Sequence, residues 1–166
     1  MVLLEAKRHF LKDMYFYAYD SFEGLPESSS NHDFDQRWKA GVLSTSESEF
    51  IKLIKESNLF NKNINLFKGF YNQSLKNINL NIYSNKKASL INIDCDLYDS
   101  AVSIFDFIDN ILKEGTILYI DDYFNGYKGN PTKGVSGALK EWNNNSKWNL
   151  ELYREVGWAG RSYIVY

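Results

Sequence analysis

Residues 90–98 read Leu-Ile-Asn-Ile-Asp-Cys-Asp-Leu-Tyr, and residues 117–123 read Ile-Leu-Tyr-Ile-Asp-Asp-Tyr. Each segment is a short apolar run, typical of a buried strand, that ends in a pair of carboxylates. A stretch of helix length separates the two runs, as a parallel βαβ unit requires. Parallel strands end at one edge of a sheet, and open α/β folds bind their ligands at that edge. We therefore expect four acids to lie together there: Asp94, Asp96, Asp121 and Asp122.

Such a cluster of acids predicts a cation site. Neighbouring carboxylates repel one another unless a cation, a proton or a substrate hydroxyl separates them. Carboxylate oxygens are the ligands of hard divalent cations, so the pattern predicts magnesium. The alternative is that some of the acids only cap the following helix, and we expect Asp96 or Asp99 to do so. Asp20, which ends another apolar run, fits both a loop-capping acid and a carboxylate that binds the hydroxyls of a ribose.

The composition is that of a soluble globular protein. The chain has 166 residues, of which 44% are hydrophobic, and a formal net charge of −2. This length predicts one domain, residues 1–166, with its own core. The charge gives no electrostatic case for a nucleic acid or an anionic membrane as partner, and no apolar stretch is long enough to span a bilayer. Cys95 is the only cysteine, which excludes an internal disulfide and favours a cytoplasmic location.

Apolar periodicity and turn residues predict alternating strands and helices. Strands are expected at residues 15–19, 64–67, 89–93 and 116–120, followed by an antiparallel pair at the C-terminus. Helices are expected at residues 2–12, after the capping box at 46–49, at 100–114 with Gly115 as the C-terminal cap, and around 135–142. This order predicts an α/β three-layer sandwich with a mostly parallel sheet.

Four segments together resemble the macrocin O-methyltransferase family. Asp-Ser-Phe-Glu-Gly-Leu-Pro-Glu at residues 20–27 is a specific signature. Lys-Gly-Phe at 68–70, Asp-Cys-Asp-Leu-Tyr-Asp-Ser at 94–100 and Ile-Asp-Asp-Tyr at 120–123 follow with similar order and spacing. The resemblance implies a class I, Rossmann-like methyltransferase that uses S-adenosylmethionine and magnesium. The acceptor would be a hydroxyl of a saccharide or of a glycosylated natural product, and a homo-oligomer remains open.

The resemblance also implies roles for individual residues. The metal ligands would be Asp94, Asp121 and Asp122. The cofactor site would contain Asp20 at the ribose, with Ser21, Gly69 and Phe70. Asp94 is the candidate base for the hydroxyl proton, and His32, which we expect to be mostly solvated in a polar loop, is a second candidate.

The chain departs from the family at its start. A class I methyltransferase has a first strand, ending in a glycine-rich turn, in the middle of its sheet, and residues 2–12 resemble the helix that follows it. We therefore expect an N-terminally truncated methyltransferase fold. The alternatives are that the two flanking strands close up, or that a partner chain supplies the missing strand.

Two other functions compete with this interpretation. An Asp-x-Asp motif after an apolar strand also occurs in glycosyltransferases that bind a nucleotide-sugar through manganese, although that would leave the second acidic strand end unexplained. The other alternative is an inactive methyltransferase relic or fragment that keeps the acids without holding the cofactor. Measuring which ligand binds separates the three functions.

Overall fold

The computed structural model describes residues 2–11, 13–28, 31–33, 39–59, 62–84, 86, 88–125 and 130–166. Helices and strands alternate along the chain: α1 (Val2–Arg8), β1 (Phe16–Asp20), α2 (Glu47–Glu56), β2 (Ile64–Lys68), α3 (Tyr71–Ser74), the short 3-10 helices η1 (Leu75–Asn77) and η2 (Leu80–Tyr83), β3 (Leu90–Ile93), α4 (Tyr98–Ile108), β4 (Ile117–Ile120), α5 (Gly134–Asn145), β5 (Leu150–Val156) and β6 (Gly160–Val165). The α/β fold class expected from the sequence is confirmed.

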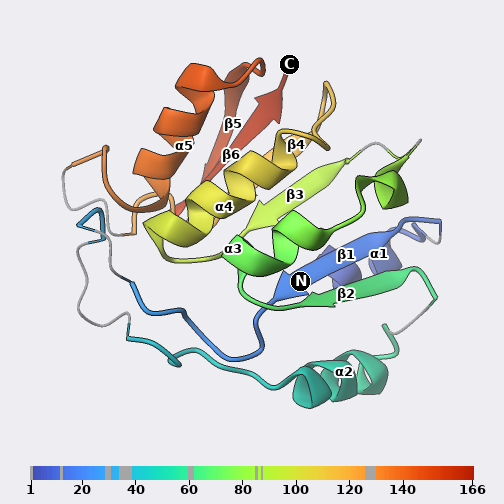
Figure 1. Ribbon diagram of the computed structural model, residues 1–166. Coiled ribbons are helices and arrows are strands. Elements are labelled where there is room, and N and C mark those ends of the chain that lie inside the picture. Colours follow the sequence, from blue (N-terminus) through green and yellow to red (C-terminus); the bar gives the residue numbers. More distant parts are fainter. Residues whose placement is uncertain are drawn as a thin grey trace.

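The strands form two separate sheets (Figure 1). In the smaller sheet β1 and β2 pair in parallel, with Tyr19 opposite Phe67. In the larger sheet the order is β3-β4-β6-β5, where β3 and β4 are parallel and β6 runs antiparallel to both of its neighbours. The expected antiparallel C-terminal pair is thus present. Within the described part of the chain β1 and β3 do not pair, so the alternative that the two flanking strands close up is wrong.

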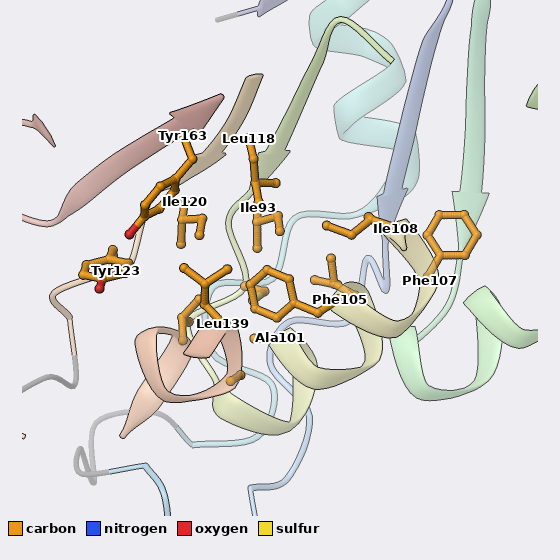
Figure 2. Packing of buried hydrophobic residues seen from close by; sticks show 14 of the residues in the cluster. Ile93, Ala101, Phe105, Phe107, Ile108, Leu118, Ile120, Tyr123, Leu139 and Tyr163 are labelled. Atoms are coloured by element: carbon orange, nitrogen blue, oxygen red, sulfur yellow. The ribbon is translucent and has the colours of Figure 1, made fainter. Parts of the chain in front are cut away.

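Helices α4 and α5 cover one face of the larger sheet (Figure 1). Helix α4 buries Phe105 and Ala101 completely, and Figure 2 shows Phe105 pointing toward Ile93 of β3 and Leu118 of β4. Burying a large apolar side chain such as Phe105 contributes about 1.5–3 kcal/mol to stability. Side chains alternate between the two faces of a strand, so the neighbours of Leu118 on β4 face away from these helices. This core therefore fixes which β4 side chains are buried.

Aromatic side chains tie the smaller sheet to α4, α3 and η2. The Tyr19 ring stacks on Phe67 at 5.0 Å and meets Phe107 of α4 edge-on at 5.8 Å. The Tyr19 hydroxyl also hydrogen-bonds the Tyr83 hydroxyl, and Tyr71 donates a hydrogen bond from its hydroxyl to the Tyr19 carbonyl oxygen at 3.2 Å. Among the described residues no backbone ladder joins the two sheets, and these side chains hold the smaller sheet against the helices instead.

The end of helix α4 lies earlier than expected. The Asn110 side chain donates hydrogen bonds to the carbonyl oxygens of Asp106 and Phe107 at 3.1 and 3.2 Å, and so competes with the backbone ladder of the helix. Gly115, with φ +77°, donates its backbone N–H to the Val165 carbonyl oxygen at 2.8 Å and belongs to the turn that enters β4. The expectation that Gly115 caps this helix is therefore wrong. None of the described helices has the length and apolar character that crossing a membrane requires.

Candidate metal and cofactor site

Three carboxylates converge at the ends of β3 and β4. Asp94 directly follows β3, and Asp121 and Asp122 directly follow β4. One oxygen of each side chain lies within 4.8 Å of the others. The Asp121 backbone N–H donates to the Ile93 carbonyl oxygen at 2.9 Å, which continues the parallel pairing past the strands and keeps their ends in register. The structure thus brings together the three residues that the resemblance gives as metal ligands.

Repulsion and burial disfavour full ionisation of this cluster. Burial raises the pKa of Asp94 above its usual range, and the charges of Asp122, Asp121 and Asp20 raise it further. Burial also raises the pKa of Asp122, against the stabilising hydrogen bonds that its carboxylate accepts from the Asn125 side chain and the Asp96 backbone N–H, each at 3.2 Å. A divalent cation would remove this repulsion, so the electrostatics favour a cation at this place.

The spacing of the oxygens fits a hard divalent cation. Magnesium binds oxygens at about 2.0–2.1 Å, so two ligands on opposite sides of the ion lie about 4.2 Å apart. Three ligands of an octahedral ion include at least two adjacent pairs, about 3 Å apart, so the carboxylate oxygens, which lie within 4.8 Å of one another, would have to move closer when the cation binds. We conclude that Asp94, Asp121 and Asp122 fit magnesium.

Asp96 has a different role from the one predicted. We expected Asp96 or Asp99 to cap α4, but the N-cap position is Leu97, without a side-chain cap, and the Tyr98 N–H donates to Asp33 at 2.9 Å. Asp96 instead adopts φ +58°, in a tight turn closed by a hydrogen bond from the Leu97 N–H to the Cys95 carbonyl oxygen at 2.6 Å. Such a backbone is uncommon for residues other than glycine, and it occurs often at functional sites.

The pKa of Asp96 marks it as part of the acidic cluster. Burial raises this pKa to about 7, and the charges of Asp122, Asp94 and Asp121 add to the shift. A carboxyl with a pKa near neutrality is suited to exchanging a proton with a bound hydroxyl. The sequence placed Asp96 at this edge of the sheet, but gave no sign of its backbone conformation or of its pKa.

Two predicted cofactor residues lie at the ends of β1 and β2. Asp20 ends β1, and its carbonyl oxygen accepts the Gly69 N–H at 2.9 Å, which ties the two strand ends together. The Asp20 side chain is exposed, and its Oδ1 accepts the Phe22 N–H at 2.6 Å in a local turn. Its charge also raises the pKa of Asp94. An exposed carboxylate at a strand end fits the two hydroxyls of a ribose.

The other two predicted cofactor residues have structural contacts. The buried Ser21 hydroxyl donates to the Gly24 carbonyl oxygen at 2.8 Å and accepts the Glu23 N–H at 3.0 Å, so it shapes the loop. Phe70 is half-buried and stands at the N-cap position of α3. Direct contacts of Ser21 and Phe70 with a cofactor remain predictions.

Tyr71 is a site residue that the sequence analysis missed. Burial raises its pKa, and the charges of Cys95, Asp20 and Asp94 raise it further. A buried tyrosine hydroxyl needs a hydrogen-bond partner, which here is the Tyr19 carbonyl oxygen. No sequence signal identifies this contact, because its partners are distant along the chain.

We expected His32 to be mostly solvated, but it is half-buried in the structure. Its half-buried ring stacks on the Tyr98 ring at 4.2 Å, and its carbonyl oxygen accepts the Gly134 N–H at 2.9 Å. These contacts hold His32 where α4 and α5 begin. His32 as a second candidate for the base stays a prediction.

A known protein family matches most of the chain. The profile of the family described as macrocin-O-methyltransferase (TylF) matches residues 2–160. The chain belongs to the macrocin O-methyltransferase family. No curated protein sequence gives a significant match.

Solved structures of O-methyltransferases share the fold of this family member. The O-methyltransferase NovP superposes with a TM-score of 0.78 and 19% identity, and covers 98% of the chain. The calicheamicin methyltransferase CalS11 has a TM-score of 0.74, 14% identity and the same coverage. An O-methyltransferase from Bacillus cereus, in complex with SAH, has a TM-score of 0.54 and 16% identity over 99% of the chain and 78% of its own length. These similarities establish a class I methyltransferase fold.

The chain is shorter than NovP and CalS11. It spans 64% of the length of NovP and 66% of the length of CalS11. The two sheets seen here thus correspond to part of each of those proteins.

Proposed function

We propose that this protein is an S-adenosylmethionine-dependent, magnesium-assisted O-methyltransferase that acts on a sugar hydroxyl. The observation that supports this most directly is the set of oxygens from Asp94, Asp121 and Asp122 within 4.8 Å of one another at the carboxyl ends of β3 and β4. Family membership supports methyl transfer as the reaction. The metal and the sugar acceptor are our inference from the carboxylate chemistry and the family.

In this proposal the residues have separate tasks. Asp20 holds the ribose of the cofactor, and Asp94, Asp121 and Asp122 hold the metal. Bound magnesium would stabilise negative charge on the acceptor oxygen, and bound S-adenosylmethionine would supply the methyl group. Asp94 is the first candidate to accept the hydroxyl proton. Because a carboxylate bound to a cation is a weaker base, His32 and Asp96 are the alternatives.

The acceptor we propose is a saccharide or a glycosylated natural product. CalS11 is described as a TDP-rhamnose 3'-O-methyltransferase of calicheamicin biosynthesis. A hydroxyl on such a sugar holds its proton tightly at neutral pH, so a cation and a carboxylate beside it are the groups that its methylation needs. We also propose a cytoplasmic location, which the single cysteine favours.

One alternative keeps specific support. An inactive relic or fragment is favoured by the break between the two sheets, because the break lies between the strand ends that carry Asp20 and Asp94. The glycosyltransferase alternative has no such support, since the chain belongs to a methyltransferase family.

Calorimetric titration with S-adenosylhomocysteine, with and without magnesium, tests the proposal. We expect micromolar binding by the wild-type chain and at least a tenfold loss in Asp20→Asn, because the amide replaces the acceptor that both ribose hydroxyls use. Asp13→Asn is the matched control, since Asp13 is also exposed and lies outside the site. A folded chain that binds no S-adenosylhomocysteine would support the inactive alternative.

A further inference from the structure

Tyr119 and Asp121 lie on the same face at the end of β4. Leu118 and Ile120 are fully buried on the side of α4 and α5, so the alternation of the strand places Tyr119 and Asp121 on the opposite side. There the Tyr119 hydroxyl donates a hydrogen bond to Oδ1 of Asp121. Tyr119 is thus the partner of one of the three carboxylates in the cluster.

Strand β6 makes room for this contact. A Cβ atom on Gly160 would stand 2.6 Å from the Tyr119 hydroxyl oxygen and 3.0 Å from its Cε2. Any side chain at position 160 would therefore displace the tyrosine ring from its present place. The pairing of β4 with β6, in which Tyr119 stands opposite Ser162, fixes the backbone on both sides of the ring. The pairing of β4 with β6 and the lack of a side chain on Gly160 thus define where the Tyr119 hydroxyl lies.

We propose that Tyr119 is a positioning residue that orients the Asp121 carboxylate for cation binding. This inference rests on the proposed function, because the orientation of Asp121 matters only if Asp121 binds a cation. The hydrogen bond restricts rotation of the Asp121 carboxylate in the metal-free protein. Cation binding therefore costs less side-chain conformational entropy. Groups that hydrogen-bond metal ligands in this way typically contribute 10–100-fold to metal affinity.

The same contact has a purely structural interpretation. In that case the hydrogen bond would only fasten the end of β4, and its loss would lower the stability of the metal-free chain. Because Tyr119 is half-buried and Tyr119→Phe removes a single oxygen, we expect the melting temperature of the metal-free protein to stay within about 2 °C of wild type. Cation affinity and metal-free stability therefore separate the two roles.

The test is Mn²⁺ binding to the purified 166-residue chain, followed by electron paramagnetic resonance and competed with Mg²⁺. We expect Tyr119→Phe to raise the Kd for Mn²⁺ about tenfold. Tyr153→Phe, at a tyrosine of β5 that is 53% exposed, is the matched control and should bind like wild type. Asp121→Asn should abolish Mn²⁺ binding, which assigns the measured site to this carboxylate.

Each other outcome overturns the inference in a recognisable way. An unchanged Kd in Tyr119→Phe, with wild-type binding lost in Asp121→Asn, would leave the metal site standing and remove the role of Tyr119. A weaker Kd together with a clearly lower metal-free melting temperature would assign Tyr119 a structural role. No Mn²⁺ binding by the wild-type chain would overturn the proposed metal site, and this inference with it.

Discussion

The Asp33 carboxylate accepts the backbone N–H of Tyr98 at 2.9 Å, across 65 residues of sequence. This N–H belongs to the first turn of α4, whose N-cap residue provides no side-chain hydrogen bond. The second carboxylate oxygen of Asp33 accepts the Ser28 hydroxyl at 2.9 Å. One side chain thus ties the loop after β1 to the helix that follows the acidic strand end. Helix ends need such partners, and here tertiary structure supplies one.

Asp33→Ala should therefore destabilise the protein more than Asp99→Ala. Loss of a helix-capping acceptor costs about 0.5–2 kcal/mol, whereas an exposed acid in the first helical turn contributes about 0.3–1 kcal/mol through the helix dipole. Urea unfolding of both variants measures the difference. Asp99 is the matched control because it lies in the same first turn of α4. An equal or larger effect of Asp99→Ala would mean that the local acid caps the helix.

Asp121→Asn should abolish divalent-cation binding and metal-dependent methyl transfer while leaving folding nearly intact. The substitution removes one charge from a cluster whose members raise the pKa of Asp94 by repulsion, so no stabilising ion pair is lost. Circular dichroism melts without metal, together with a methyl-transfer assay on sugar acceptors, provide the two measurements. Asp106→Asn, on α4, is the control. A large drop in melting temperature for Asp121→Asn would show that the acid is structural.

The stability of the metal-free protein should fall as pH rises from about 4 to about 7. The pKa of Asp96 is raised from 3.8 to about 7 in the folded chain, and the pKa values of Asp94 and Asp122 are also raised. Within this window the folded state binds more protons than the unfolded state, so raising the pH favours unfolding. Melting temperatures in EDTA across this range measure the slope.

Two further experiments identify the groups that cause this dependence of the melting temperature on pH. Asp96→Asn should reduce the fall in melting temperature with rising pH, because the asparagine side chain does not titrate. Magnesium should raise the melting temperature more at about pH 8 than at about pH 5, since protons compete with the cation for the same oxygens. A slope that is unchanged in Asp96→Asn would place its origin in other groups.

Gly24→Ala should disturb the loop after β1 far more than Gly41→Ala. Both glycines have positive φ, +82° and +79°, so alanine costs about 1–2 kcal/mol at either position. A Cβ on Gly24 would also stand 2.4 Å from the Val42 carbonyl oxygen, whereas a Cβ on Gly41 would meet nothing within 4 Å. We expect Gly24→Ala to weaken S-adenosylhomocysteine binding by displacing Asp20, and Gly41→Ala to lower only the stability. Calorimetry and thermal melts on both variants decide this, and equal binding by the two would contradict it.

Local patterns were enough to predict the strands and the edge where the acids gather. An apolar run followed by a polar residue identifies both a buried strand and its end, and parallel pairing then brings Asp94 and Asp121 to one edge. The ends of α4 were harder to predict. The helix stops early because the Asn110 side chain bonds to the backbone, and its first N–H is accepted by a residue far along the chain.

The sequence by itself determined the alternating order of elements, the acids at the strand ends and the family, because each depends on residues that are neighbours along the chain. Only the tertiary structure decided the break between the two sheets, the stacking of His32 on Tyr98 and the hydrogen bond from Tyr119 to Asp121 beside Gly160. It also decided the pKa of Asp96, which is raised to about 7 by burial and by carboxylates from another strand. These properties depend on distances between segments that are remote in sequence, and packing sets those distances.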